Sequence, residues 1–495
     1  MTGLEVRVVP ELSRVPIADY VLQFIAATQI LYLVWNAKSI IAYGSWDRGD
    51  LFADAANPLP DMEMNLPKIT AILAARSETD SVLRRSLQSL LALQYPKEKR
   101  EILLVTDADD LTTGRIADQL SQELGVTHLV VPDNSDPAWN RIIQQARDRG
   151  AKWADIDADQ LPHSKPRALT YALPFATGEV ITVVDAEDVQ GDPLVFLKAA
   201  QCLQVKGYHA VQGRLRFINY RDSWLSLQAI GDYAFWFAWL LPKIRMRGLP
   251  VALGGTCYYV RRDVLDSLGG WDPTNVTEDL ELGLRLYGYG YRVGLLDVDT
   301  YEESPRKLLR TQSEGGWANQ RTRWIRGTIY TAGRLGKYRK EFPLKRRLAI
   351  ALLLFYYVLG LFVPFLSLIG YPLMVLSLLI AVLLPIQAVS RVSMPAPLLP
   401  IIDNPWLAAI SAFNMLLLLW HVYLTTRGIA RTIGKTVVGA GEKIHYYGLV
   451  VTTVMFYWIL WGLPVLRAIW QTLRGAKFWE KTLHEGLHHS VLDRF

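Results

Sequence analysis

Cysteine is scarce in this sequence of 495 residues, and a strong net charge is absent. The two cysteines, Cys202 and Cys257, match no disulfide framework and no metal-binding spacing. Disulfides are typical of secreted proteins, so we expect the main domain to lie in the reducing cytoplasm. The net charge is only +6, and basic residues cluster at 334–347, directly before an apolar segment. That position favours a lipid bilayer as the partner over a nucleic acid.

Charged residues are absent from the whole of segment 348–390. As one helix this segment would be roughly 65 Å long, about twice the hydrocarbon core of a bilayer. Gly370-Tyr371-Pro372 is the natural break, which predicts two membrane spans. Segments 407–426 and 446–466 are apolar as well and predict two more. The chain is 51% hydrophobic, which is high for a wholly soluble protein.

A basic start and a small-residue cleavage pattern are missing near the N-terminus, so a cleaved signal peptide is not expected there. Residues 20–46 instead predict one membrane helix. Five regions follow from these patterns. They are an N-terminal segment with this helix (1–46), a linker (47–65), a cytoplasmic domain with helices at the membrane surface (66–345), a bundle of about four spans (346–470) and a cytoplasmic tail (471–495). Basic residues in loop 427–445 conflict with this count, so an interfacial C-terminal helix remains an alternative.

Between residues 66 and 190, strand-like runs alternate with helical ones. Residues 69–75, 101–106, 128–131 and 179–184 resemble buried strands, and 81–93 an amphipathic helix. This alternation predicts an α/β domain with a mainly parallel sheet, whose chemistry lies at the carboxyl ends of the strands. Acidic residues follow several of these strands. Glu78 and Asp107 follow the first two, although turn residues in such places are often acidic too.

A second group of acids follows the run 179–184, as Asp185-Ala186-Glu187-Asp188. Such an arrangement is suited to holding a hard divalent cation against a diphosphate. Further along, Thr277-Glu278-Asp279 precedes a helical pattern, and Gln320-Arg321-Thr322-Arg323-Trp324 comes about 40 residues later. Glu278-Asp279 alone would suit a helix start, but the combination suggests a general base and a cationic clamp.

These motifs, in this order and ahead of apolar segments, resemble the membrane-embedded family 2 glycosyltransferases of the cellulose synthase and curdlan synthase type. The resemblance covers residues 66–330 by motif and the remainder by hydropathy. It implies a nucleotide-sugar-binding GT-A domain beside a helical transmembrane bundle in the plasma or inner membrane. The implied activity is that of a hexosyltransferase, transferring a sugar with inversion from a UDP-sugar to a growing β-linked polysaccharide and passing it across the bilayer.

The resemblance also implies roles for individual residues. Asp279 would be the general base, with Glu278 beside it in the catalytic motif, and Mg²⁺ or Mn²⁺ would be held by Asp185 and Glu187. Glu78, Asp107, Lys165 and Asp185 would contact the nucleotide. The acceptor and the diphosphate would meet Gly255, Thr256, Gln320, Arg323 and Trp324. The sequence departs from the family in having Ala75 where Pro is usual and Glu187 as the second acid of Asp-x-Asp.

Other interpretations compete with this one. A non-processive glycosyltransferase acting on a lipid carrier is the main alternative. His484-Glu485-Gly486-Leu487-His488 matches the zinc-protease pattern, but such matches are common by chance, and an amphipathic tail is favoured. Asp155-Ile156-Asp157-Ala158-Asp159 lacks the Gly and Glu of a calcium loop and predicts a solvated loop. An accessory or regulatory subunit remains open as a partner.

Overall fold

The computed structural model describes residues 65–217, 219, 221–309, 316–338, 340–357, 405–433 and 440–475, with single positions at 27 and 30. The chain divides into two compact units. One comprises residues 1–40 with 362–421, and the other comprises residues 41–361 with 422–495. Every residue of the candidate site described below belongs to the second unit.

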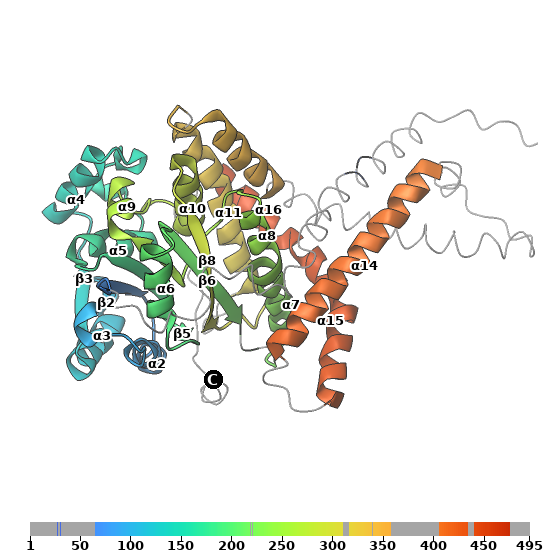
Figure 1. Cartoon of the computed structure of the whole chain (residues 1–495), viewed down its shortest axis with the longest axis horizontal. Coiled ribbons are helices and arrows are strands. Elements are labelled where there is room, and N and C mark those ends of the chain that lie inside the picture. Colours follow the sequence, from blue (N-terminus) through green and yellow to red (C-terminus); the bar gives the residue numbers. More distant parts are fainter. Residues whose placement is uncertain are drawn as a thin grey trace, which may run out of the picture. The chain divides into compact units, whose positions relative to one another are not determined.

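An eight-stranded sheet organises the second unit (Figure 1). Its strands are β1 (Ile69–Ala75), β2 (Arg100–Asp107), β3 (Thr127–Val131), β4 (Val180–Asp185), β5 (Val189–Gln190), β6 (Ala210–Phe217), β7 (Tyr258–Arg261) and β8 (Val293–Glu302). They lie in the order β3-β2-β1-β4-β7-β6-β8-β5. The first four in this order are mutually parallel, as are β6 and β8, whereas β7 and β5 run antiparallel to their neighbours. The predicted α/β fold with a mainly parallel sheet is confirmed.

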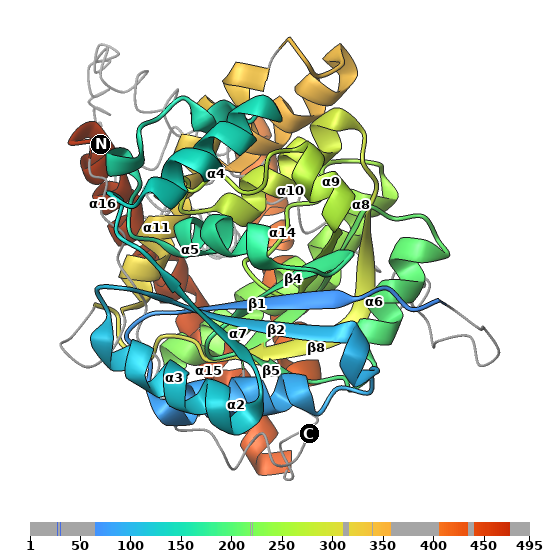
Figure 2. The same cartoon turned by 90° about the vertical axis from the view of Figure 1, so that its left-hand side faces the viewer.

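Alternation along the strands sends side chains into two apolar cores. Ile69, Ala71 and Leu73 of β1 face one core, and Ile72 faces the other, because successive strand residues point to opposite faces. The first core is covered by α2 (Asp80–Leu91), α3 (Leu111–Leu124) and α6 (Val195–Gln204). The second is covered by α4 (Pro137–Asp148), α5 (Lys165–Ala172), α9 (Arg262–Ser267) and α10 (Glu278–Tyr289). Figure 2 shows α2 and α3 on one side of the sheet and α4 and α5 on the other.

Local sequence signals set where these helices begin and end. Asp110 caps α3 by accepting a hydrogen bond from the backbone N–H of Thr113, and Gly125 follows the helix with a φ of 68°. Ser164 caps α5 in the same way, which fixes the start of the helix that carries Lys165. Gly290 ends α10 with a φ of 96°, a conformation that glycine adopts without strain.

The aromatic-rich segment 229–241, a candidate for one of the helices expected at the membrane surface, forms a continuous helical stretch. It forms the end of α7 (Trp224–Tyr233), a π-helical turn (Ala234–Leu240) and the start of α8 (Leu241–Met246), so Pro242 does not stop the helix. Phe235, Phe237 and Trp239 are buried. These three side chains are therefore packed inside the protein, an environment that suits aromatic residues as well as an interface does.

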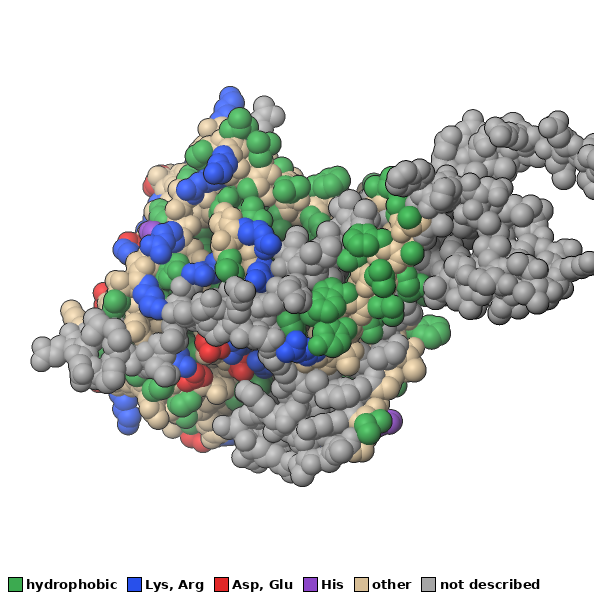
Figure 3. Space-filling model, turned by 45° about the vertical axis from the view of Figure 1, so that its right-hand side comes forward, with side chains coloured by type: hydrophobic (Ala, Val, Ile, Leu, Met, Phe, Trp, Pro, Cys, Tyr) green, Lys and Arg blue, Asp and Glu red, His purple; other side chains and the backbone are tan. Residues whose placement is uncertain are grey.

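The helices after residue 316 include α11 (Trp317–Leu335), α14 (Pro405–Ile433), α15 (Ala440–Leu460) and α16 (Gly462–Leu473), and residues 344–357 are helical as well. Several hydrophobic side chains of α14, such as Phe413, Leu416 and Leu419, are exposed. Figure 3 shows that hydrophobic side chains reach the surface in several places on the face in view. Among the residues that the structure describes, no helix combines the length and apolar character needed to cross a bilayer. The predicted transmembrane bundle therefore has no support in this part of the chain. Most of segments 20–46 and 348–390, and the tail motif at 484–488, lie outside the described residues.

Candidate functional site

The carboxyl ends of β1, β2 and β4 form one edge of the sheet, where the predicted acids gather. The chain steps outward from β1 to β2 and β3 and then returns to place β4 against the other side of β1. A ligand is expected outside the strand ends at such a reversal of strand order. Asp107 ends β2, Asp185 ends β4, and Glu78 follows β1 as a buried residue.

Two arginines clamp Asp107. Arg76 donates to one carboxylate oxygen at 2.9 Å, and the buried Arg167 donates to the other at 2.7 Å. Arg76 also contacts both oxygens of Asp109, at 2.7 and 2.8 Å. Asp109 accordingly has a lowered pKa, chiefly because of its hydrogen bond with Arg76. The clamp ties the loop after β1 to the loop after β2.

The same loops contain a group of side chains that could be taken for a metal site. Ligand atoms of Asp107, Asp109 and His163 lie within 4.8 Å of one another. However, Arg76 and Arg167 already place two guanidinium groups on these carboxylates, so a divalent cation would meet repulsion there. We therefore assign this cluster to ion pairing between loops rather than to metal binding.

Lys165 stands at the centre of the site. Its ammonium group forms an ion pair with Oδ1 of Asp185 and donates to the carbonyl oxygen of Gly255 at 2.7 Å. Burial lowers the pKa of Lys165, but the charges of Asp185 and Glu278 more than offset this, so its pKa is raised. Lys165 therefore stays positively charged, as a group that meets a phosphate must.

Gly255 marks the point where three predicted residues converge. A methyl group placed on its Cα would lie 3.5 Å from Oδ2 of Asp279, 3.7 Å from Nζ of Lys165 and 3.8 Å from Oδ2 of Asp185. These residues come from three separate stretches of sequence. The expected base, cation and nucleotide-binding acid therefore surround a position where only a hydrogen atom projects from the chain.

Glu278 and Asp279 open helix α10 at this point. Burial and the charge of Asp185 raise the pKa of Asp279 to about 6, against the opposing effects of the Leu280 N–H and Lys165. Burial and the charge of Asp279 raise the pKa of Glu278 to about 8. The pKa of Asp279 thus lies below that of Glu278, so Asp279 is the first of the two to lose its proton. Asp279 can therefore accept a proton, and its pKa suits a general base.

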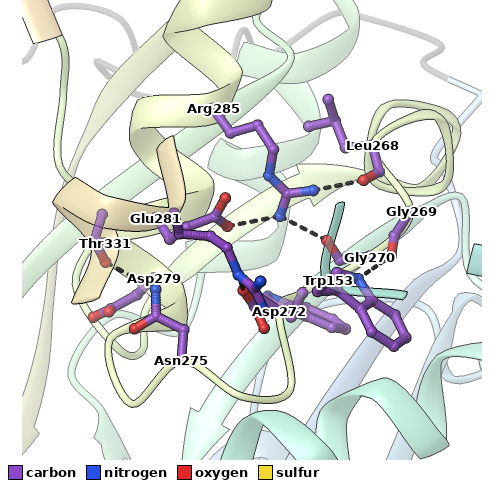
Figure 4. Close-up of polar contacts among 12 residues, drawn as sticks. Trp153, Leu268, Gly269, Gly270, Asp272, Asn275, Asp279, Glu281, Arg285 and Thr331 are labelled. Atoms are coloured by element: carbon purple, nitrogen blue, oxygen red, sulfur yellow. Dashed lines mark hydrogen bonds and ion pairs between the residues drawn. The ribbon is translucent and has the colours of Figure 1, made fainter. Parts of the chain in front are cut away.

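Buried polar contacts hold the loop that leads into α10 (Figure 4). Arg285 pairs with Glu281 at 2.8 Å, and its guanidinium also donates to the backbone oxygens of Leu268 and Gly270. Near the helix start, Asn275 donates to the hydroxyl of Thr331 on α11 at 2.8 Å. A buried ion pair that is also hydrogen-bonded fixes geometry, because breaking either partner leaves a charge without compensation. Asp279 is thus carried on a firmly positioned helix end.

Helix α11 brings the Gln-x-x-Arg-Trp motif to the same place. A methyl group on Gly327 would lie only 2.4 Å from a side-chain carbon of Thr277, so α11 packs directly against the start of α10. Burial lowers the pKa of Arg323, an effect opposed by the nearby charges of Asp185, Glu278 and Glu187. Gln320 is buried, and the Trp324 ring lies 6.1 Å from that of Tyr233.

Thr256, predicted to line the acceptor site, is buried against the turn formed by Asp185-Ala186-Glu187-Asp188. Its hydroxyl contacts Asp188 and the carbonyl oxygen of Val183, and the Asp185 N–H donates to Asp188 at 3.0 Å. Thr256 therefore supports the turn that presents Asp185 and Glu187. This position places it next to the predicted metal ligands.

Several carboxyl groups lie close together around the turn Asp185-Ala186-Glu187-Asp188 and the end of β8, an arrangement that suits a divalent cation. Oδ1 of Asp188 and Oε1 of Glu302 are buried and have no hydrogen-bond partner among the described residues. Burial raises the pKa of Glu302 well above its usual value, and the charges of Asp188, Glu187 and Asp185 add to this. Carboxylate oxygens are the ligands that Mg²⁺ and Mn²⁺ prefer. The residues present therefore suit the predicted cation.

Sequence reasoning missed several members of the site. Arg76 and Arg167 stand one and two residues from positions that were singled out, yet nothing in their local pattern indicates that both reach Asp107. Glu302 is separated from Asp185 by more than a hundred residues, and only the pairing of β8 with its neighbours brings it near. Of these three residues, only Arg76 could have been suspected from the sequence, because it is a charged residue directly after a strand.

Comparison with known proteins supports a sugar-transfer domain. Residues 180–394 match the family described as glycosyl transferase family group 2. This match begins at β4 and includes every predicted motif from Asp185 to Trp324, whereas β1 to β3 lie before it. Residues 180–394 are thus similar to a family 2 glycosyltransferase domain.

Curated relatives are glycosyltransferases of different kinds. The chain is 27% identical to a probable glycosyltransferase of Bacillus subtilis, covering 61% of this chain and 64% of that protein. It is 23% identical to a β-monoglucosyldiacylglycerol synthase of Trichormus variabilis, covering 61% and 60%. It is 24% identical to a poly-β-1,6-N-acetyl-D-glucosamine synthase of Staphylococcus epidermidis, covering 52% and 54%. The chain thus spans less than two thirds of the length of these relatives.

Among solved structures, a mannosyltransferase from Pyrobaculum calidifontis in complex with GDP-Man and Mn²⁺ aligns with 90% of this chain and 99% of its own. The identity is 14% and the TM-score is 0.45.

Proposed function

We propose that this chain is an inverting glycosyltransferase with a GT-A domain, which moves a sugar from a UDP-sugar to a hydroxyl group of an acceptor. The observation that carries the proposal is the convergence of Asp279, Lys165 and Asp185 around Gly255. It places the expected base, Asp279, close to the ammonium group of Lys165, with only Gly255 between them. The family match over residues 180–394 supports the same reaction class.

In the proposed reaction, Asp279 removes the proton of the acceptor hydroxyl as that oxygen attacks the anomeric carbon of the donor. The new glycosidic bond forms as the bond from the anomeric carbon to the diphosphate breaks. UDP leaves with the electron pair, and the proton stays on Asp279. Lys165 and Arg323 supply positive charge for the diphosphate, because a planar guanidinium can bind phosphate through two hydrogen bonds.

A divalent cation, Mg²⁺ or Mn²⁺, belongs to this proposal. Asp185 and Glu187 would hold it, with Asp188 behind them as support. When bound, the cation supplies a Lewis acid that neutralises charge on the leaving diphosphate. Glu78 and the clamped Asp107 would contact the nucleoside at the neighbouring strand ends.

For the acceptor, we propose the end of a growing β-linked polysaccharide. The Gln-x-x-Arg-Trp motif supports this choice, as does similarity to proteins named poly-β-1,6-N-acetyl-D-glucosamine synthases. Similarity to β-monoglucosyldiacylglycerol synthases favours a second candidate, in which one sugar is transferred to a lipid. Membrane location and transport of the product are part of the proposal and are supported by the uncharged segment 348–390.

The test is release of UDP from a panel of UDP-sugars by the purified full-length protein, with Mg²⁺ or Mn²⁺ and after chelation. We expect turnover of one donor that requires the metal and is lost in Asp279→Asn. Asp159→Asn, at an exposed acid away from the site, is the matched control and should keep full turnover. Absence of both turnover and binding for every donor would refute the proposal.

The products of the same reaction decide the acceptor. A ladder of chain lengths supports the polysaccharide, and a single sugar attached to lipid supports the second candidate. Turnover that survives Asp279→Asn would keep the reaction class but refute the assignment of the base.

A further inference from the structure

Arg321 occupies the variable position beside Gln320 in the Gln-x-x-Arg-Trp motif, and it is completely buried. Its guanidinium carbon lies 4.0 Å from the centre of the Trp324 ring. It also donates to the side-chain oxygen of Gln320 at 2.5 Å. One arginine therefore contacts two of the residues expected to meet the acceptor.

The other surroundings of Arg321 come from the start of α11, from the C-terminal part of the chain and from α7. Its guanidinium carbon lies 5.5 Å from the ring centres of both Trp317 and Trp461. A guanidinium nitrogen lies 3.8 Å from Oδ2 of Asp232 on α7. Stacking on aromatic faces and pairing with a carboxylate are two ways to compensate a buried guanidinium, and Arg321 uses both.

Asp232 is in turn held by α15. The hydroxyl of Tyr457 donates to Asp232, and the indole N–H of Trp317 lies 3.3 Å from the same hydroxyl oxygen. The rings of Trp317 and Tyr457 lie 5.4 Å apart. The chain of contacts therefore runs from Tyr457 on α15 through Asp232 to Arg321, and from there to Trp324.

Helix α16 completes this arrangement along the length of α11 (Figures 1 and 2). The hydroxyl of Thr322 lies 3.4 Å from the carbonyl oxygen of Pro464, and Arg326 donates to Gln471 at 3.2 Å. The helix that carries the motif is thus fixed to α16 by direct polar contacts on both sides of Arg323.

We infer that Arg321 is a positioning residue, which Asp232 and Tyr457 hold so that it sets the side-chain orientation of Gln320 and Trp324 toward the acceptor. The inference rests on the proposed function and adds that helices α15 and α16 form part of the acceptor site. Lys165 and Asp185, which serve the donor, are held by the contacts around Gly255 instead. Loss of the Arg321 contacts should therefore weaken acceptor use and leave nucleotide binding intact.

The experiment measures two quantities in the full-length protein, the acceptor KM in UDP release and the affinity for UDP by calorimetric titration. The acceptor probes are tetrasaccharides of β-linked glucose and of β-linked N-acetylglucosamine. In Tyr457→Phe, which removes one hydroxyl and keeps the ring, we expect the acceptor KM to rise roughly tenfold with UDP affinity unchanged. Asp232→Asn should act in the same direction.

Two substitutions of arginine complete the design. Arg321→Met should raise the acceptor KM more than Arg321→Lys, which retains the positive charge. Arg474→Met is the matched control, because the exposed Arg474 follows the last residue of α16 and lies 4.2 Å from the ring of the exposed Trp470. It should change neither quantity.

Each outcome has a separate meaning. A wild-type protein that turns over no donor refutes the proposed function and this inference with it. An active wild type with an unchanged acceptor KM in both Tyr457→Phe and Asp232→Asn refutes the inference alone. A parallel loss of UDP affinity and thermal stability in both variants also refutes it, because it would show a role in folding only.

Discussion

Gly255→Ala offers the sharpest test of the site geometry. The added methyl group would lie 3.5 Å from Asp279, 3.7 Å from Lys165 and 3.8 Å from Asp185, all ordinary contact distances. The folded protein should therefore accept alanine without strain. Replacing glycine in a compatible conformation changes the free energy of unfolding by only about 0.4–1 kcal/mol, usually in the stabilising direction. We expect a melting temperature equal to that of the wild type or slightly higher.

Catalysis should respond quite differently to the same methyl group. The methyl group would occupy the space between Asp279 and Lys165. In the proposed reaction, the acceptor hydroxyl and the donor diphosphate are held in this space. Displacing reacting groups by about 1 Å can cost about 100-fold in rate. We therefore expect kcat/KM for UDP release to fall by roughly two orders of magnitude while the melting temperature is retained.

Two other glycines provide the controls for this experiment. In Gly327→Ala the new methyl group would lie 2.4 Å from Thr277, so stability should fall by about 1–3 kcal/mol through overpacking. In Gly333→Ala, on the same helix, nothing lies within 4 Å of the new group, and stability should rise by roughly 0.5–1 kcal/mol. Full activity in a folded Gly255→Ala protein would refute the view that substrates meet at Gly255. A large loss of stability in that variant would refute the distances.

Two further predictions concern pH. The pKa of Asp279 is raised to about 6, and only the ionised carboxylate can accept a proton. We therefore expect kcat/KM for UDP release, measured between about pH 5 and pH 8, to fall as pH drops below about 6. A pH profile that is flat down to about pH 5 would contradict this assignment. Burial by itself would raise the pKa of Asp299, but the charges of Arg214 and Arg216 lower it to about 2. Asp299 should therefore contribute about 2 kcal/mol to the free energy of unfolding above about pH 4. That contribution should vanish as pH falls from about 4 to 2. In urea unfolding curves, Asp299→Asn should remove this pH-dependent change in the free energy of unfolding. The same change in the variant as in the wild type would exclude Asp299 as its source.

Prediction from sequence succeeded where local pattern and sheet geometry act together. The apolar runs at 69–75 and 179–184 became β1 and β4 to within a residue, because a buried strand needs a continuous apolar segment. Because β2 and β4 both run parallel to β1, Asp107 and Asp185 lie on one edge of the sheet. Lys165 and Asp279 also arrived at this edge, as the motif resemblance implied.

Where one pattern serves two environments, the sequence leaves the environment of a segment open. The aromatic residues at 233–239 suited both a membrane surface and a protein core, and the structure buries Phe237 in the core of the sheet domain. The apolar segments 407–426 and 446–466 are helical, but the described residues contain no helix long and apolar enough to span a bilayer. Composition measures how apolar a segment is, and it does not say what covers it.

The sequence by itself determined the α/β fold, the edge of the sheet that carries the chemistry and the residue types available there. Only the tertiary structure decided which charges meet. The pairing of Arg167 with Asp107, and of Arg321 with Asp232 and Trp324, joins residues from separate helices and strands. Local sequence fixes backbone conformation over a few residues, whereas the partner of a buried charge is set by how distant elements pack, since each such charge needs compensation inside the fold.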